Sequence, residues 1–260
     1  MKTYLGIDIG STTSKAVLID REARIVAKAL LNAGTGTYGA REIRRTLFET
    51  SGLDEGTVEH SVVTGYGRKT YAGADSQMSE LSCHAKGTHY LFPEARTVID
   101  IGGQDAKVIR LDREGRMREF VMNDKCAAGT GRFLDVMAGI LQLRVEELET
   151  LAAQSAEPAR ISSTCTVFAE SEVISQLAAG TALPDLVAGI CASVARRIGA
   201  QAKRLGVEER VCMSGGVARN AAVRLYMERE LGTEVLTSPL AQYTGALGAA
   251  LYARTKAEQE

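Results

Sequence analysis

The sequence repeats one short chemical pattern. Residues Ile7–Gly10 followed by Lys15 match residues Ile99–Gly102 followed by Lys107 at one constant offset, and each copy places an aspartate before a glycine turn. In each copy an apolar strand pattern runs into the turn and out of it again, which predicts a β-hairpin. The backbone N–H groups at such a tip suit a phosphate, and the two aspartates suit a Mg²⁺ ion held on that phosphate.

Two similar hairpins predict two similar half-domains that face one ligand. Neither copy is a P-loop, because the Gly-x4-Gly-Lys-Ser/Thr spacing is absent and the residues after Lys15 predict a strand where a P-loop requires a helix. A Gly-x-Gly-x-x-Gly pattern does occur at Gly34–Gly39, between a predicted strand and a predicted helix, so a dinucleotide-binding turn is an alternative. That alternative leaves the two Asp-Gly hairpins unexplained.

Size and composition bound the class of protein. The chain has 260 residues, 45% apolar and 24% charged side chains and a net charge of −1, which indicates a globular protein of one large or two ordinary domains. A charge near zero provides no basic field for nucleic acid. No apolar run approaches the roughly 20 residues that cross a bilayer, and no signal-peptide pattern is present, so we expect a cytoplasmic protein without nucleic-acid or membrane partners.

The cysteines argue against a disulfide framework and against a self-contained zinc site, because the five are odd in number and widely spaced. Two of them, Cys126 and Cys165, come just before predicted helices at residues 133–141 and 167–179. The free N–H groups at a helix N-terminus, together with the positive end of the helix dipole, stabilise a thiolate and any anionic cluster that the thiolate binds. The matched context of the two thiols therefore indicates a shared role.

Two thiolates fall short of the four that a four-iron cluster takes. One completion is two thiolates from each of two chains on a two-fold axis. A redox-active or regulatory pair of thiols is the alternative, and the spacing does not separate the two. The remaining cysteines are expected to be packing residues, since Cys83 and Cys191 fall in predicted helices and Cys212 falls within a predicted strand.

The last third of the chain predicts a second ligand-binding turn. Residues 211–220 predict a strand, a Gly-Gly turn and the start of a helix, and Gly215 and Gly216 permit close backbone approach to a flat ligand. The small-residue helix predicted at 245–253 allows close helix packing. We predict two domains, at residues 1–95 and 96–260, with this C-terminal helix packing back on the first.

These features, in this order, resemble the nucleotide-binding superfamily of actin, the Hsp70 chaperones and the sugar kinases. Within it, the segments NDKCAAGTGRFLDVMA and SSTCTVFAESEVISQL resemble the ATP-dependent activators of 2-hydroxyacyl-CoA dehydratases. ATPase activators of benzoyl-CoA reductase or other double-cubane-type reductases are the alternative within the same motifs. The resemblance covers essentially the whole chain. It implies an α/β fold of two similar lobes, duplicated ribonuclease-H-like domains of the actin/Hsp70/acetate-sugar-kinase type, around an ATP cleft.

The resemblance implies an ATP-hydrolysing electron-transfer protein. It would be a homodimer holding one [4Fe-4S] cluster between the subunits through Cys126 and Cys165 of each. A reduced ferredoxin or flavodoxin would charge the cluster. One low-potential electron would then pass to a 2-hydroxyacyl-CoA dehydratase, with the (R)-2-hydroxyglutaryl-CoA enzyme as the first expectation.

The resemblance also implies roles in the ATP site. Asp8 and Asp100 would lie near Mg²⁺ or the attacking water, and Gln104 would orient that water. The residues implied to bind ATP or ADP are Ser11, Thr12, Thr13, Ser14, Lys15, Gly102, Gly103, Gly215, Gly216, Asn220 and Gln242.

Two other classes of function fit the same fold. A small-molecule kinase needs an acceptor pocket, and the short connections of this chain leave little room for one. An actin-like or chaperone-like protein would use ATP only for assembly. That class gives no reason for Cys126 and Cys165 to precede helices.

Overall fold

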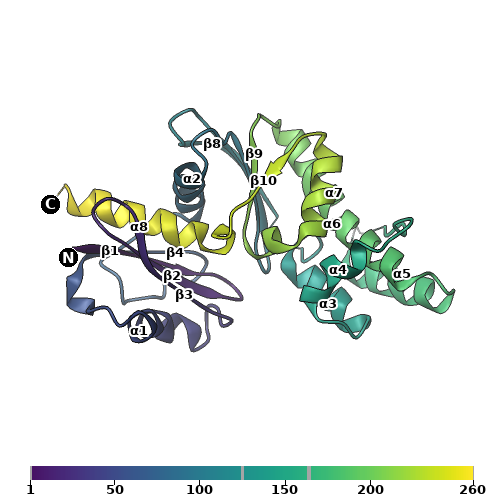
Figure 1. The fold of residues 1–260 in the computed structure, drawn as a ribbon, viewed down its shortest axis with the longest axis horizontal. Helices are drawn as coiled ribbons and strands as arrows, with labels where there is room; N and C mark the ends of the chain where they lie inside the picture. Colours follow the sequence, from purple (N-terminus) through teal and green to yellow (C-terminus); the bar gives the residue numbers. More distant parts are fainter. Residues whose placement is uncertain (1, 124–125, 163–164, 260) are drawn as a thin grey trace. The chain divides into compact units, whose positions relative to one another are not determined.

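The protein divides into two compact units (Figure 1), seen in a computed structural model that describes residues 2–123, 126–162 and 165–259. Positions 124, 125, 163 and 164 of the two cysteine segments lie outside the described residues. The first unit comprises Met1–Glu94, Leu111–Met117 and Gln242–Glu260, and the second comprises Ala95–Arg110 and Arg118–Ala241.

The first unit is a five-stranded sheet in the order β3-β2-β1-β4-β5. Strand β1 pairs antiparallel with β2 and parallel with β4. The strands are β1 (Thr3–Ile9), β2 (Ser14–Ile19), β3 (Ile25–Leu31), β4 (Val58–Thr64) and β5 (Ser76–Gln77). The helices are α1 (Gly39–Ser51), the 3₁₀ turn η1 (Glu55–Thr57), α2 (Glu80–Leu91) and α8 (Thr244–Ala257), which follows the 3₁₀ turn η4 (Ala241–Tyr243).

Side chains of this sheet alternate between its two faces, and both faces are buried. Leu5 and Ile7 lie in one cluster with Ile43 of α1, whereas Tyr4 and Val17 lie in another with residues of α8. Figure 1 shows α1 and α8 on opposite sides of the strands. Because both faces are covered, the strands read as nearly continuous apolar runs.

The second unit repeats this topology with a sheet in the order β10-β9-β6-β7-β8. Strand β6 pairs antiparallel with β7 and parallel with β9, as β1 does with β2 and β4. The strands are β6 (Thr97–Ile101), β7 (Ala106–Leu111), β8 (Met117–Asn123), β9 (Val211–Ser214) and β10 (Val235–Leu236). The helical elements are α3 (Gly131–Ile140), η2 (Val145–Glu147), α4 (Leu148–Ala152), α5 (Thr166–Ala178), α6 (Leu183–Leu205), η3 (Gly216–Arg219) and α7 (Ala221–Leu231). The predicted duplication is confirmed.

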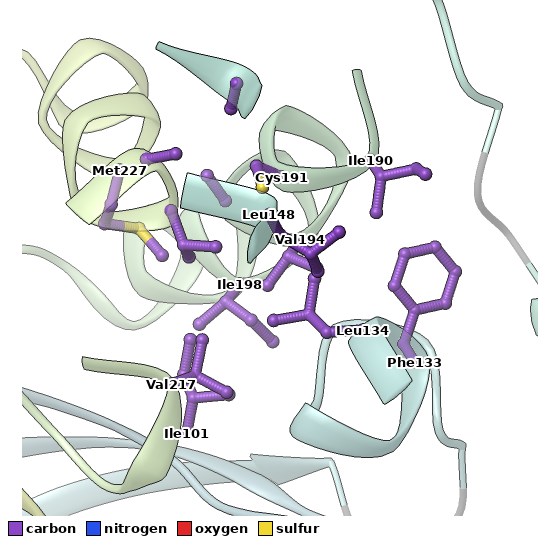
Figure 2. Packing of buried hydrophobic residues seen from close by; sticks show 14 of the residues in the cluster. Ile101, Phe133, Leu134, Leu148, Ile190, Cys191, Val194, Ile198, Val217 and Met227 are labelled. Carbon is purple, nitrogen blue, oxygen red and sulfur yellow. The ribbon is translucent and has the colours of Figure 1, made fainter. Parts of the chain in front are cut away.

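Helix α6 forms the centre of the second unit's core. Figure 2 shows its Val194 and Ile198 beside Leu134 of α3, with Ile101 at the end of β6 close by. Phe133 of α3 is also fully buried. One continuous apolar cluster thus links the second hairpin to the helices that follow Cys126.

The glycine pattern at Gly34–Gly39 has a packing reason. A Cβ atom at Gly34 would lie 2.3 Å from the carbonyl oxygen of Ser11, so the loop after β3 runs directly against the tip of the first hairpin. A Cβ atom at Gly39 would likewise lie 2.0 Å from the carbonyl oxygen of Ala33. Close backbone packing accounts for these glycines without a dinucleotide.

Other predicted elements appear with small shifts. The helices predicted at residues 133–141 and 167–179 are observed as α3 and α5, which begin two residues and one residue earlier. In the described part of the chain, no helix is long and apolar enough to span a membrane.

Small residues let α8 pack very closely on its neighbours in the first unit. Gly248 faces the backbone of α2, and a Cβ there would lie 1.8 Å from the carbonyl oxygen of Cys83. On the sheet side, a Cβ at Gly6 would lie 2.0 Å from the carbonyl oxygen of Ala246. The predicted close packing of this helix is therefore confirmed.

We expect Gly248→Ala to destabilise the protein by about 1–3 kcal/mol, because the added methyl group meets backbone that cannot rotate away. The matched control is Gly139→Ala in α3, where a Cβ meets nothing within 4 Å. That control should be neutral or stabilising by up to about 1 kcal/mol. Urea unfolding of the two variants measures both effects, and equal midpoints would contradict the packing argument.

Candidate functional site

The first hairpin joins β1 to β2 and places an aspartate and a lysine opposite each other. The N–H of Gly10 donates to the carbonyl of Thr13 (3.0 Å) and closes the tip. Asp8 is only 4% exposed, and Lys15 Nζ lies 3.4 Å from its Oδ2 atom, in register across the two strands. The ammonium group thus balances a buried carboxylate directly behind the turn.

The second hairpin reproduces this arrangement between β6 and β7. The N–H of Gly102 donates to the carbonyl of Asp105 (2.9 Å), and Lys107 Nζ lies 3.3 Å from Oδ2 of Asp100. Asp100 and Lys107 are each 2% exposed. The hydroxyl of Ser214 at the end of β9 donates to Oδ1 of Asp100 (2.8 Å), so both carboxylate oxygens have fixed partners.

The two hairpins differ in charge. Lys107 is buried and also pairs with Asp105 (2.7 Å), so one ammonium group serves two carboxylates. In the first hairpin, the side chain of Lys15 is 13% exposed and is paired with Asp8. The first tip is therefore the more favourable one for an anionic phosphate, and the second, with an extra carboxylate, is the more favourable one for a cation.

A glycine with a positive φ angle packs against the end of the first strand of each hairpin. Gly65 (φ 88°) follows β4 and Gly215 (φ 85°) follows β9. A Cβ atom would lie 2.5 Å from the carbonyl oxygen of Ile9 in the first case and 2.2 Å from that of Ile101 in the second. Both the backbone conformation and the close approach exclude other residues at these positions.

Ser214 and Gly65 were not among the site residues predicted from the sequence. The pattern that could have indicated them is a hydroxyl residue followed by glycine at the end of an apolar strand, which occurs at Thr64–Gly65 and again at Ser214–Gly215. The two copies differ in what the hydroxyl does, because Thr64 donates to the carbonyl of Met78 (3.1 Å), whereas Ser214 binds Asp100.

The other predicted nucleotide-binding residues fall at the hairpin tips and at two helix starts. Ser11, Thr12 and Thr13 lie half-buried at the first tip, and Gln104 is exposed at the second. The hydroxyl of Ser14 donates to the carbonyl of Ala33 (2.7 Å) and is thus turned into the fold.

The remaining predicted positions divide between the units. Gly216 opens η3 in the second unit, and Asn220 caps α7 there by accepting from the N–H of Val223 (3.0 Å). Gln242 lies in η4 and belongs to the first unit.

The cysteines separate into two groups by burial. Cys83, Cys191 and Cys212 are buried, as predicted, and burial raises the pKa of each thiol to about 12. Cys126 and Cys165 are half-buried and carry free thiols. Among the described residues no group of three or more His, Cys, Asp or Glu side chains is arranged around a metal position.

The two half-buried cysteines have different helix contexts. Cys165 is the N-cap of α5, as predicted. Cys126 lies further from its helix, because the N-cap of α3 is Thr130. The prediction of free N–H groups at the start of α3 is wrong: Gly131 donates to the carbonyl of Gly102 (2.9 Å) and Arg132 to that of Gly103 (2.7 Å).

These hydrogen bonds connect the second hairpin tip to the segment that contains Cys126. Gly131 also fits the tip closely, since a Cβ there would lie 3.1 Å from the carbonyl oxygen of Gly102. In addition, α3 packs against α5, the helix that Cys165 caps. One unit thus contains the second hairpin and both half-buried cysteines, with backbone hydrogen bonds from the hairpin to the start of α3 and packing of α3 against α5.

Comparison with known proteins identifies the family. The sequence profile of the BadF/BadG/BcrA/BcrD ATPase family matches residues 5–253. The chain belongs to this family. The predicted ATP binding and enzyme class are therefore confirmed.

Three relatives of this ATPase match it over nearly their whole length. The chain is 52% identical over 255 residues to a 2-hydroxyisocaproyl-CoA dehydratase activator of Clostridioides difficile, covering 98% of this chain and 96% of the relative. It is 56% identical over 255 residues to the (R)-2-hydroxyglutaryl-CoA dehydratase activating ATPase of Acidaminococcus fermentans, covering 97% of each. Identity to a benzoyl-CoA reductase subunit of Thauera aromatica is 31% over 270 residues, covering 100% and 95%.

Solved structures confirm the predicted fold class. The Clostridium difficile activator with bound ADPNP superposes with a TM-score of 0.96 at 52% identity, covering 99% of this chain and 96% of that one. A ROK family glucokinase from Streptomyces griseus matches with a TM-score of 0.58 at 16% identity, covering 97% and 99%, which shows a shared fold alone.

We expect Ellman's reagent to label Cys126 and Cys165 rapidly in the native, metal-free ATPase at pH 8, while Cys83, Cys191 and Cys212 react only after denaturation. With a pKa of about 12, a buried thiol is ionised in only about one molecule in ten thousand at that pH. Mass spectrometry of labelled peptides identifies the sites. Rapid native labelling of Cys191 would contradict this assignment.

We expect Ser214→Ala to lower kcat for ATP hydrolysis about tenfold, because Asp100 loses the donor that orients it. The matched control is Thr64→Val, which removes the equivalent hydroxyl of the first unit, where it donates to the carbonyl of Met78 and not to an aspartate. Steady-state phosphate release measures both variants, and equal rates would show that the Ser214 hydroxyl does not act through Asp100.

Proposed function

We propose that this ATPase activates a 2-hydroxyacyl-CoA dehydratase by delivering one low-potential electron. The supporting similarity is to proteins named as activators of dehydratases with different 2-hydroxyacyl-CoA substrates, at 52–56% identity over nearly the whole chain. Identity to the benzoyl-CoA reductase subunit is lower, at 31%, so a dehydratase is the favoured partner. The (R)-2-hydroxyglutaryl-CoA enzyme is the first candidate because that activator has the highest of these identities.

The observation that carries the proposal is the contact between the second hairpin and α3. The carbonyls of Gly102 and Gly103 accept from the N–H groups of Gly131 and Arg132, at the start of the helix after Cys126. A shift of the tip on phosphate binding or release therefore alters the hydrogen bonds of that helix. The segment containing Cys126 follows the nucleotide state of the ATPase.

The proposed nucleotide site uses both hairpin tips. Lys15 and the half-buried tip of Ser11, Thr12 and Thr13 would bind phosphate, since this tip carries the more accessible ammonium group. The carboxylates of Asp8 and Asp100 would face Mg²⁺ or the attacking water, and Gln104 would orient that water.

The remaining nucleotide-binding residues keep the roles that the resemblance implies. Gly215, Gly216 and Gln242 would line the adenosine, and Gly102 and Gly103 would approach the phosphates through backbone N–H groups. Ser14 and Asn220 would bind the nucleotide through backbone groups. Their side chains are already engaged, because the Ser14 hydroxyl donates to the carbonyl of Ala33 and the Asn220 carboxamide caps α7.

A [4Fe-4S] cluster fits the thiols present. Cys126 and Cys165 are half-buried, carry free thiols and come from segments whose helices pack together, whereas the other three thiols are buried with raised pKa values. Two ligands per chain would require a homodimer with two thiolates from each copy. Once bound, the cluster would supply one-electron storage at low potential.

The proposed partners follow from that chemistry. A reduced ferredoxin or flavodoxin would provide the electron, and the dehydratase would accept it. Free, reduced thiols fit a cytosolic site of action. A kinase function has only the fold-level likeness to the glucokinase in its favour.

We expect Asp100→Asn to abolish ATP hydrolysis, with at least a hundredfold loss of kcat, because an amide is a poor Mg²⁺ ligand and cannot accept a proton. Iron and sulfide content after anaerobic purification should equal that of the wild type, since Cys126 and Cys165 are unchanged. Phosphate-release kinetics and iron analysis measure the two effects. Retained turnover would remove Asp100 from the mechanism.

We expect anaerobically purified protein to contain about four iron and four sulfide per dimer and to show a broad charge-transfer absorption. Cys126→Ser and Cys165→Ser should each lose the iron, while Cys191→Ser, at a buried thiol, serves as the control and should keep it. Colourless, iron-free wild-type protein with normal ATPase activity would refute the electron-transfer function.

A further inference from the structure

Asn123 ends the edge strand β8 and binds the loop that contains Cys126. Its Nδ2 atom lies 2.9 Å from the carbonyl oxygen of Cys126 and 3.1 Å from that of Ala128. A carboxamide nitrogen carries two N–H donors, so this one group serves both carbonyls. The side chain therefore bridges the loop across the cysteine.

A third carbonyl of the loop is also held. The buried hydroxyl of Thr130 donates to the carbonyl of Ala127 (2.7 Å). Three successive carbonyls, of Cys126, Ala127 and Ala128, thus point toward donors of the protein. In a trans peptide the N–H points opposite to the carbonyl, so the N–H groups of Ala127 and Gly129 are directed away from the Asn123 carboxamide.

Packing fixes one half of this loop and leaves the other half to hydrogen bonds. Ala128 is fully buried, and Gly129 (φ 86°) lies against α6, with an added Cβ only 3.0 Å from Cδ1 of Ile198. Cys126 and Ala127 are only half-buried. The Asn123 bond to the Cys126 carbonyl consequently acts on the less packed part of the loop, which contains the sulfur ligand.

We propose that Asn123 is a positioning residue for Cys126, which holds the cysteine and the N–H groups of Ala127 and Gly129 in one arrangement toward an anionic iron–sulfur cluster. This inference rests on the proposed function and adds a residue to it. N–H donors near cluster sulfur atoms stabilise the reduced, more negative state and raise its potential. Asn123 thus influences both the retention of iron and the potential of the cluster, without touching either.

The test compares Asn123→Ala with Asn123→Asp in full-length protein purified anaerobically. Asn123→Asp keeps the size of the side chain but cannot donate to the two carbonyls, and it remains informative where the alanine variant folds poorly. Asn32→Ala and Asn32→Asp are matched controls at an exposed position of the first unit. Circular dichroism verifies the fold of every variant.

Iron transfer to a colorimetric chelator is expected to be about tenfold faster in both Asn123 variants, because two hydrogen bonds to the loop are lost. The midpoint potential should fall and the EPR signal of the reduced protein should broaden, neither of which a purely structural role would cause. The Asn32 variants should match the wild type.

Unchanged iron release, potential and EPR signal in both Asn123 variants would overturn this inference and leave the proposed function intact. Wild-type protein that takes up no iron or sulfide under anaerobic reconstitution would overturn the proposed electron-transfer function, and this inference with it.

Discussion

A carboxylate buried in a hairpin needs a cation within reach, and this requirement shapes both halves of the protein. Each unit meets it with a lysine directly opposite the aspartate in the strand register, Lys15 for Asp8 and Lys107 for Asp100. Removing one partner of such a buried pair costs about 3–5 kcal/mol, because the other charge is left in a poorly solvated place. The pair also fixes the hairpin register, since a one-residue slip would turn the lysine to the opposite face. The tips that follow are therefore presented in a defined position.

Duplication and later divergence explain how one template serves two tasks. The two sheets share one strand order, and both hairpins end against a glycine with a positive φ angle. Between the third and fourth strands the first unit has one long helix, α1, whereas the second has α3 to α6. Both half-buried cysteines lie in that longer connection, and its first helix is hydrogen-bonded to the hairpin tip. Both cysteine segments thus lie in one connection of the duplicated fold, next to the second hairpin.

Local sequence patterns predicted the strands, the hairpins and the separation of buried from accessible cysteines. The strands on either side of each Asp-Gly turn and the Asp–Lys spacing are encoded by neighbouring residues, so the sequence predicts them. Contacts between distant residues were not predictable in this way. The hydroxyl of Ser214 meets Asp100 only because β9 adds beside β6, more than a hundred positions away in the chain. The prediction of free N–H groups at the start of α3 was wrong for the same reason, since these donors bind carbonyls of a hairpin that lies earlier in the sequence.

The order of the chain has a consequence for synthesis on the ribosome. One face of the first sheet is covered by α8, whose alanines and leucines complete the cluster around Tyr4 and Val17. The residues of the second unit end at Ala241, before α8 begins. The first unit therefore cannot cover this apolar face until α8 has been synthesised, although most of its residues are made first.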